Sequence, residues 1–214
     1  TATHGVPLMP NLLRHWLLIL LACTLPLAVH AADLPFQEGK DYVRLPTPVA
    51  PETSDKVEVI EMFWYGCPHC HDLEPSVQEW LKRKPDNVEF TRIPVAFGAS
   101  WEPGARAYYA AEELGVLDKV HQPLFDAYHQ RRKLSNEDEL AAFFAEHSVD
   151  QEAFRKAYKS FQTETQLRRG NQLAQRFGVR GVPAVIVNGK YDVRSPRMFE
   201  VVDFLIAKEA SPQS

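Results

Sequence analysis

The chain has 214 residues, with 24 Lys and Arg against 28 Asp and Glu, so its formal net charge is −4 at pH 7. This length is enough for one sizeable hydrophobic core. The mild acidity argues against nucleic acid as a partner. No internal repeat or low-complexity tract is present, which excludes repeat and low-complexity architectures.

The first 31 residues have the pattern of a secretory signal peptide. Arg14 and His15 precede an uncharged run of 14 residues, Trp16 to Val29, and Val29-His30-Ala31 supplies the exit that a signal peptidase inspects. A membrane anchor is the alternative, but Pro26 interrupts the run and a spanning helix needs roughly 20 residues. We therefore predict export, with cleavage after Ala31.

The predicted export affects how the cysteines are interpreted. The chain contains Cys23, Cys67 and Cys70, and Cys23 would leave with the signal peptide. Exported proteins usually use cysteines to join distant parts of the fold. The remaining pair is separated by only two residues and would close a very small loop, so it points to chemistry rather than to a structural staple.

The first expected element is a short strand at residues 41–45. Residues 57–64 form a nearly continuous apolar run, typical of a strand buried on both faces. A helical pattern covers residues 68–84, and residues 88–93 are typical of another strand. Strand, helix and strand in this order predict a βαβ unit with two parallel strands.

A helical pattern dominates residues 97–162. Within it Phe154, Ala157, Tyr158 and Phe161 repeat with the spacing of one helix face. We expect this stretch to form a helical domain inserted into an α/β framework.

The framework resumes with a helix at 163–177, a strand at 184–187, a hairpin turn at Asn188-Gly189 and a strand at 191–193. A final helix is expected at 197–207. This order predicts an α/β protein with the thioredoxin fold and an inserted helical domain. The predicted domain bounds are 32–96 and 163–208 for the thioredoxin-like domain, 97–162 for the insertion and 209–214 for a loose tail.

Cys67-Pro68-His69-Cys70 lies where the buried strand gives way to a helix. Pro68 suits the first helical turn, which places Cys67 at the helix N-terminus, where free N–H groups and the helix dipole stabilise a thiolate. The pKa of Cys67 should therefore lie below the roughly 8.5 of a free cysteine, and His69 can add a donor or a positive charge. Stabilising the thiolate stabilises the reduced protein and makes its disulfide a strong oxidant.

Two other interpretations of this motif remain open. Cys67 and Cys70 with His69 and His71 could form half of a zinc site, although a structural zinc normally needs four ligands and no second pair exists. The disulfide could also be purely structural, although so small a loop constrains little. We predict no metal and no bound cofactor.

Three segments together carry a family resemblance. Phe63-Trp64-Tyr65-Gly66-Cys67-Pro68-His69-Cys70, Gly181-Val182-Pro183 and Val187-Asn188-Gly189-Lys190-Tyr191 resemble the DsbA family of periplasmic dithiol oxidases. The resemblance implies that Cys67 is the exposed nucleophile, that Cys70 is the buried resolving thiol and that the Val182–Pro183 bond is cis and faces them. The Val182 backbone would then pair with an extended substrate peptide. Trp64 and Tyr65 are candidates to line the peptide groove, and a place in the core is an equal alternative for Trp64.

Glu61 lies in the middle of the apolar strand, where a carboxylate is costly to bury. It could point to a solvated face. The resemblance implies instead a buried acid near Cys70, paired with a basic residue on the next strand, where Arg92 stands. Because Arg92 stays charged, we expect it to favour the ionised form of Glu61.

Other polar residues are not expected to take part directly in the chemistry. Glu74, one turn beyond Cys70, is expected to be a surface charge that tunes the site weakly. His121, His129 and His147 are expected to be ordinary residues of the helical insertion.

The leading hypothesis is a monomeric oxidase that donates the Cys67–Cys70 disulfide to newly exported, reduced proteins in the periplasm. The resemblance implies reoxidation by a quinone-linked membrane partner of the DsbB kind. The second hypothesis is a disulfide isomerase or reductase with the same fold. The third is a non-enzymatic periplasmic module that binds metal or peptide through Cys67, Cys70 and His71.

Overall fold

The computed structural model describes residues 1, 2, 35–53 and 55–210. The chain divides into two units, Thr1–Pro35 and Phe36–Ser214, and the sheet and its helices belong to the second. Nearly all of the predicted signal peptide lies outside the described residues. None of the helices within the described ranges has the length and apolar content needed to cross a membrane.

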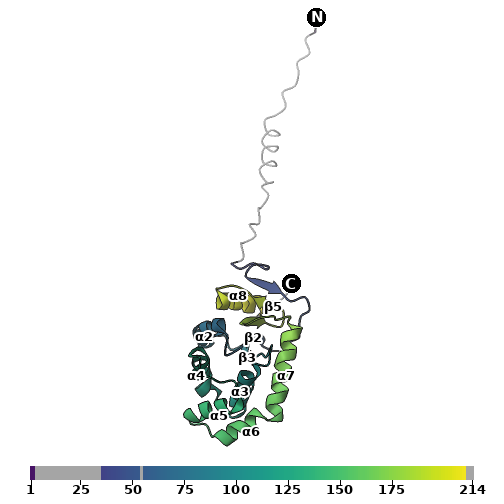
Figure 1. The fold of residues 1–214 in the computed structure, drawn as a ribbon. Coiled ribbons are helices and arrows are strands. Elements are labelled where there is room, and N and C mark those ends of the chain that lie inside the picture. Colours follow the sequence, from purple (N-terminus) through teal and green to yellow (C-terminus); the bar gives the residue numbers. More distant parts are fainter. Residues whose placement is uncertain (3–34, 54, 211–214) are drawn as a thin grey trace. The chain divides into compact units, whose positions relative to one another are not determined.

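A five-stranded mixed sheet forms the centre of the fold (Figure 1). Its strands are β1 (Tyr42–Arg44), β2 (Val57–Phe63), β3 (Val88–Pro94), β4 (Ala184–Val187) and β5 (Tyr191–Val193), in the spatial order β1-β5-β4-β2-β3. The β2 and β3 strands are parallel, and the other pairs are antiparallel. The predicted βαβ unit and the hairpin after Asn188-Gly189 are confirmed.

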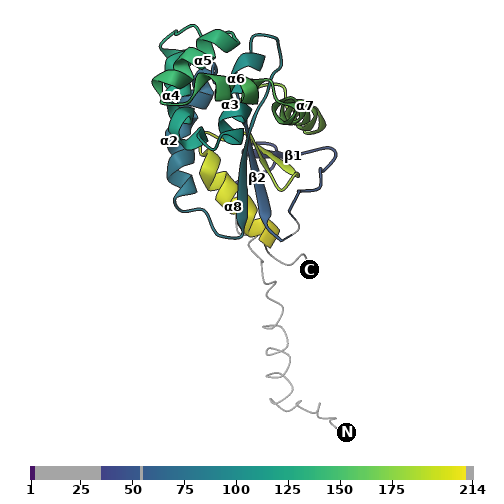
Figure 2. The same ribbon diagram turned by 90° about the horizontal axis from the view of Figure 1, so that it is seen from below.

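Helices cover both faces of this sheet, which explains why every residue of β2 is buried. On one face, Val57 and Val59 pack with α2 (Pro68–Leu81) and α8 (Met198–Ala210). On the other face, Ile60 and Met62 pack with α7 (Phe161–Arg176). Figure 2 shows α8 and α7 on opposite sides of β2. Because side chains alternate along a strand, Glu61 falls on the α2 side.

Four further helices form the insertion: α3 (Glu102–Glu113), α4 (Leu117–His129), α5 (Glu137–Glu146) and α6 (Gln151–Tyr158). Their buried side chains share a single hydrophobic core with Phe63, Cys67 and Cys70. The insertion therefore covers the end of the sheet where α2 begins. The prediction of a thioredoxin fold with helices inserted between β3 and α7 is confirmed.

Two local expectations are wrong. Phe161 does not continue the buried face of α6: its side chain is 81% exposed, because Ser160 caps a new helix at this point and accepts a hydrogen bond from the Thr163 N–H. The final helix continues to Ala210, beyond its expected end at residue 207, and so includes Glu209 of the expected tail. Residues 211–214 lie outside the described residues.

Candidate active site

The turn from β2 to α2 presents the two cysteines. Cys67 caps α2 in an extended conformation, Pro68 follows at the first helical position, and the Cys67 Sγ accepts a hydrogen bond from the Cys70 N–H at 3.3 Å. Gly66 allows the backbone of the turn to lie close to the Trp64 ring, since a Cβ at Gly66 would be only 2.4 Å from that ring. The predicted helix start is confirmed.

Both cysteines are free thiols, so the structure represents the reduced protein. The pKa of the Cys67 thiol is lowered from 9.0 to about 6, first by the hydrogen bond with the Cys70 side chain and then by backbone hydrogen bonds from Cys70 and His69 and by the charge of His69. Partial burial opposes this shift. The expectation of an acidic Cys67 is therefore confirmed, with His69, whose side chain is exposed, as the weaker contributor.

Cys70 behaves in the opposite way. Its side chain is completely buried, and the contact with Cys67 together with desolvation raises the pKa of the Cys70 thiol far above its ordinary value. Cys67 retains 6% exposure. A substrate can therefore reach Cys67 and not Cys70.

The loop before β4 faces the cysteines. The Val182–Pro183 peptide bond is cis, as the resemblance implied. The Cys67 thiol lies 3.4 Å from the Val182 carbonyl oxygen, toward which it donates. Val182 and Pro183 are both partly exposed, so this backbone lies beside the reactive sulfur and remains accessible.

Glu61 and Arg92 form the expected buried pair. The Arg92 Nε donates to the Glu61 Oε2 at 3.1 Å, and the Glu61 side chain is 1% exposed. Arg92 favours the ionised form of Glu61, as expected, but it does not decide the pKa. Burial outweighs the attraction of Arg92, and with the repulsion from Glu74 it raises the pKa of Glu61 to about 7.

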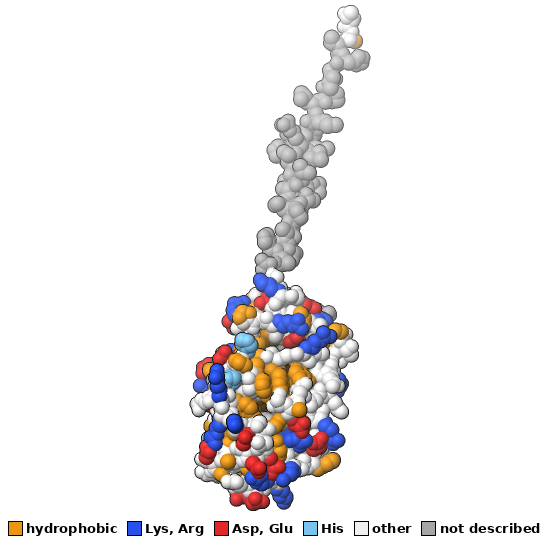
Figure 3. Space-filling model, in the orientation of Figure 1, with side chains coloured by type: hydrophobic (Ala, Val, Ile, Leu, Met, Phe, Trp, Pro, Cys, Tyr) orange, Lys and Arg blue, Asp and Glu red, His pale blue; other side chains and the backbone are white. Residues whose placement is uncertain are grey.

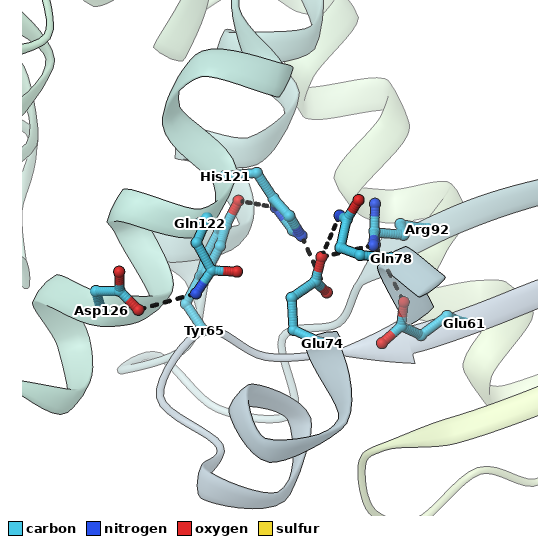
Figure 4. Close-up of polar contacts among 8 residues, drawn as sticks. All are labelled: Glu61, Tyr65, Glu74, Gln78, Arg92, His121, Gln122 and Asp126. Carbon is cyan, nitrogen blue, oxygen red and sulfur yellow. Dashed lines mark hydrogen bonds and ion pairs between the residues drawn. The ribbon is translucent and has the colours of Figure 1, made fainter. Parts of the chain in front are cut away.

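Glu74 is not a surface charge, and this is the main correction to the expected site. It is fully buried, and its Oε1 accepts hydrogen bonds from Arg92 Nη2 at 2.8 Å and from Gln78 at 2.6 Å. Its Oε2 lies 3.6 Å from His121 Nε2 (Figure 4). The helical spacing of Cys70, Glu74 and Val77 along α2 was the available signal, since all three lie on its buried face.

Tyr65 and His121 also differ from expectation. The Tyr65 side chain is 1% exposed and its hydroxyl lies 2.8 Å from His121 Nδ1, so the ring is part of the core and does not line a peptide groove. His121, expected to be an ordinary residue of the insertion, is buried between Tyr65 and Glu74. The contact between Tyr65 and His121 could not be derived from the sequence, because 56 positions separate these two residues.

Trp64 remains partly exposed, and its ring stacks on that of Trp101, with centroids 4.3 Å apart and planes 7° from parallel. His129 lies against the back of the turn: its Nε2 is 3.1 Å from the Tyr65 carbonyl oxygen, and its ring stacks on His71 at 4.4 Å. Among the described residues no three His, Cys, Asp or Glu side chains gather as a metal site requires.

A thioredoxin fold with an acidic cysteine at the start of α2, a buried partner cysteine and a cis-proline loop beside them defines a thiol:disulfide oxidoreductase. Residues 91–205 match the family model described as DSBA-like thioredoxin domain. The thiol:disulfide interchange protein DsbA of Azotobacter vinelandii is 42% identical over 182 residues, which cover 82% of this chain and 85% of the relative. The chain belongs to the DsbA family.

Relatives and solved structures agree with this assignment. The DsbA of Pseudomonas aeruginosa is 37% identical over 199 residues, covering 90% of this chain and 93% of the relative. A crystal structure of Pseudomonas aeruginosa DsbA superposes with a TM-score of 0.77 at 38% identity, covering 81% of this chain and 94% of that one. The oxidoreductase DsbA from Xylella fastidiosa gives 0.76 at 34% identity, covering 82% and 98%.

Proposed function

We propose that this oxidoreductase is a monomeric dithiol oxidase of the periplasm, exported by residues 1–31, which donates the Cys67–Cys70 disulfide to newly exported, reduced proteins. The observation that carries the proposal is the contrast between the two thiols. A protein that holds Cys67 as a thiolate near neutral pH stabilises its reduced form, and its disulfide then draws electrons from substrates.

The reaction proceeds in two exchanges. A substrate thiolate attacks Cys67 Sγ, the Cys67–Cys70 bond breaks, and Cys70 leaves with the electron pair and takes up a proton. The second substrate thiolate then attacks the substrate sulfur of the mixed disulfide, and Cys67 leaves as a thiolate. The substrate loses two electrons and gains a disulfide, and the enzyme ends in the dithiol form.

Glu61 supplies the proton that Cys70 needs. A pKa of about 7 lets a carboxyl group both release and accept a proton under ordinary conditions. Glu61 also raises the pKa of Cys70 through its charge, which reflects their proximity. The proton moves from Glu61 to Cys70 when the mixed disulfide forms, and it returns when the dithiol is oxidised again.

The substrate peptide is bound by the loop before β4. We place an extended peptide beside Val182, whose backbone precedes β4, with Pro183 holding the loop against Cys67 and Trp64 offering an apolar surface. Figure 3 shows hydrophobic side chains gathered between α2 and α7 on one face, with histidine side chains beside them. This setting suits unfolded chains, which expose apolar side chains.

Reoxidation requires an electron acceptor. We assign it to a quinone-linked membrane partner of the DsbB kind, which would accept the two electrons from the Cys67 and Cys70 thiols. No bound cofactor takes part in either half of the cycle.

A glutathione redox titration of residues 32–214 tests the direction of the reaction. The expected potential is more oxidising than about −180 mV, the value typical of protein disulfide isomerase. A potential near about −270 mV, as in thioredoxin, would contradict the proposal and favour the reductase reading. Retention of a metal after purification would favour the binding-module reading.

A further inference from the structure

A second buried carboxylate competes with Glu61 for Arg92. The Arg92 guanidinium donates through Nε to Glu61 and through Nη2 to Glu74, and its side chain is only 13% exposed. The Arg92 guanidinium therefore pairs with both the Glu61 and the Glu74 carboxyl groups in a region that is almost closed to water. Two carboxylates so close to each other and to a single cation are not ionised equally, since each disfavours the charge of the other.

The two acids have unequal support. Glu74 has Arg92, Gln78 and, at 3.6 Å, His121. Among the described residues Glu61 has a hydrogen bond from Arg92 alone, and its Oε1 lacks a hydrogen-bond partner there. Figure 4 shows Glu74 between His121, Gln78 and Arg92, with Glu61 on the far side of Arg92. These contacts favour the charge on Glu74 and leave the proton to Glu61.

The contact with Tyr65 orients His121 so that its Nε2 faces Glu74. A buried phenol keeps its proton, because burial raises the pKa of Tyr65 well above its ordinary value. The Tyr65 hydroxyl therefore donates to His121 Nδ1, and in the neutral imidazole the remaining proton sits on Nε2. Nε2 and Glu74 Oε2 both lack a hydrogen-bond partner and face one another.

We propose that Glu74, supported by His121 and Gln78, is a positioning residue that occupies Arg92 and thereby leaves Glu61 free to carry the proton of Cys70. This inference rests on the proposed role of Glu61 in the oxidase cycle. Glu74 and His121 touch neither the sulfurs nor the substrate, and they act only through the charge that Arg92 offers to Glu61.

The pKa values of the two carboxyl groups agree with this geometry. Burial raises the pKa of Glu61 to about 7, whereas contacts with His121 and Arg92 hold the pKa of Glu74 below its ordinary value in spite of burial. The residues of α8 that share a core with β2 are apolar, namely Phe199, Val201, Val202, Leu205 and Ile206. The titratable and charged groups that act on Glu61, Glu74, Arg92 and His121 include, besides these residues themselves, Cys70, Tyr65, Tyr108 and Asp118.

The test is a direct titration of the Glu61 carboxyl carbon by NMR on the disulfide form of residues 32–214, in which neither thiol titrates. The signal is assigned by its loss in Glu61→Gln. The expected midpoint in the unsubstituted protein is near 7. In Glu74→Gln it should fall by about one unit or more, because Arg92 then serves Glu61 alone and a like charge is gone.

Three further variants separate electrostatics from packing. His121→Leu should also lower the midpoint, whereas His121→Gln, which keeps an N–H near Glu74, should leave it close to that of the unsubstituted protein. Gln78→Ala changes an exposed position of α2 and should produce a smaller shift in the same direction if a buried variant fails to fold. Glu58→Gln, at a buried acid of the same strand outside the cluster, is the matched control and should not move the midpoint.

An unchanged midpoint in Glu74→Gln, or in Gln78→Ala if the buried variants do not fold, would overturn the inference. The role of Glu61 is judged separately, from stopped-flow traces of Glu61→Gln. If that variant forms the mixed disulfide with substrate as fast as the unsubstituted protein, the proposed function loses its proton carrier, whatever the titration shows. A shifted midpoint with normal Glu61→Gln kinetics would leave Glu74 tuning an acid that the reaction does not use.

Discussion

Cys67 and Cys70 are the same residue type three positions apart, yet their surroundings change their pKa values in opposite directions. Cys67 is the cap of α2 and collects N–H donors, whereas Cys70 points into the core shared with the insertion. A free thiol with a pKa near 8.5 is almost fully protonated at pH 6. Cys67, with a pKa of about 6, is half ionised there.

Alkylation of the reduced protein should therefore label Cys67 alone. At pH 6 we expect a rate at least about tenfold above that of a free cysteine, since the gain in thiolate is partly offset by its weaker nucleophilicity. The rate should follow a midpoint of about 6. Peptide mapping of iodoacetamide-treated protein gives the site, and Cys67→Ser is the control that should stay unlabelled until it is unfolded. Label on Cys70 in the native protein would reverse the proposed roles.

The residues whose positions were predicted and those that were missed differ in a physical way. Cys67 and Pro68 follow from local order along β2 and α2, and the Glu61–Arg92 pair was implied by the family resemblance. Glu74 and His121 were missed because their buried charged partners, Arg92 for Glu74 and Glu74 for His121, lie far away in the sequence. An isolated acid on a helix is usually solvated. No residue near Glu74 in the sequence indicates that Arg92 is its ionic partner.

At the scale of elements, continuous apolar runs were the most reliable signal. The β2 strand spans Val57–Phe63 against an expected 57–64, because a β-branched run between two helical layers has few alternatives. Helix ends were less reliable. The expected end of the last helix at residue 207 preceded a charged pair, Lys208 and Glu209, which the sequence alone assigns to solvent.

Glu209 instead anchors the end of α8 to the β4–β5 turn. Its carboxylate accepts from Asn188 at 2.6 Å, from Lys190 at 2.5 Å and from Tyr191 at 3.1 Å, and its side chain is 3% exposed. Glu209→Ala should lower the free energy of unfolding by about 1–3 kcal/mol, because the charged hydrogen bonds are lost and their donors are left without partners.

Urea unfolding monitored by circular dichroism measures this change. Glu79→Ala is the comparison, because Glu79 forms an exposed ion pair with Lys82 and should contribute less than about 1 kcal/mol. Equal effects of the two substitutions would mean that α8 frays before Glu209 contributes.

At the scale of the whole molecule, the state of two sulfur atoms is linked to global stability. The folded protein lowers the pKa of Cys67 to about 6, whereas the unfolded chain has an ordinary thiol near 8.5. A depressed pKa adds stability to the reduced form. That stability is complete above the unfolded value and is lost as the pH falls through about 6.

The reduced protein should therefore lose stability relative to the oxidised protein as the pH falls from about 8.5 to 5. We expect the difference between their free energies of unfolding to change by about 2 kcal/mol, after allowance for solvent screening near the surface. Denaturant titrations of both forms at the two pH values measure it. A difference that does not depend on pH would show that the folded protein does not stabilise the Cys67 thiolate.

The stacked rings of Trp64 and Trp101 have a practical consequence. Two indoles 4.3 Å apart and nearly parallel couple their electronic transitions, and such coupling appears in the ultraviolet circular dichroism. Trp64 is also tied to the reactive turn, since its carbonyl accepts the Cys67 N–H at 3.0 Å. Any rearrangement of that turn alters the geometry of the indole pair. We therefore expect mixed-disulfide formation at Cys67 to change the ultraviolet circular dichroism of the unlabelled protein.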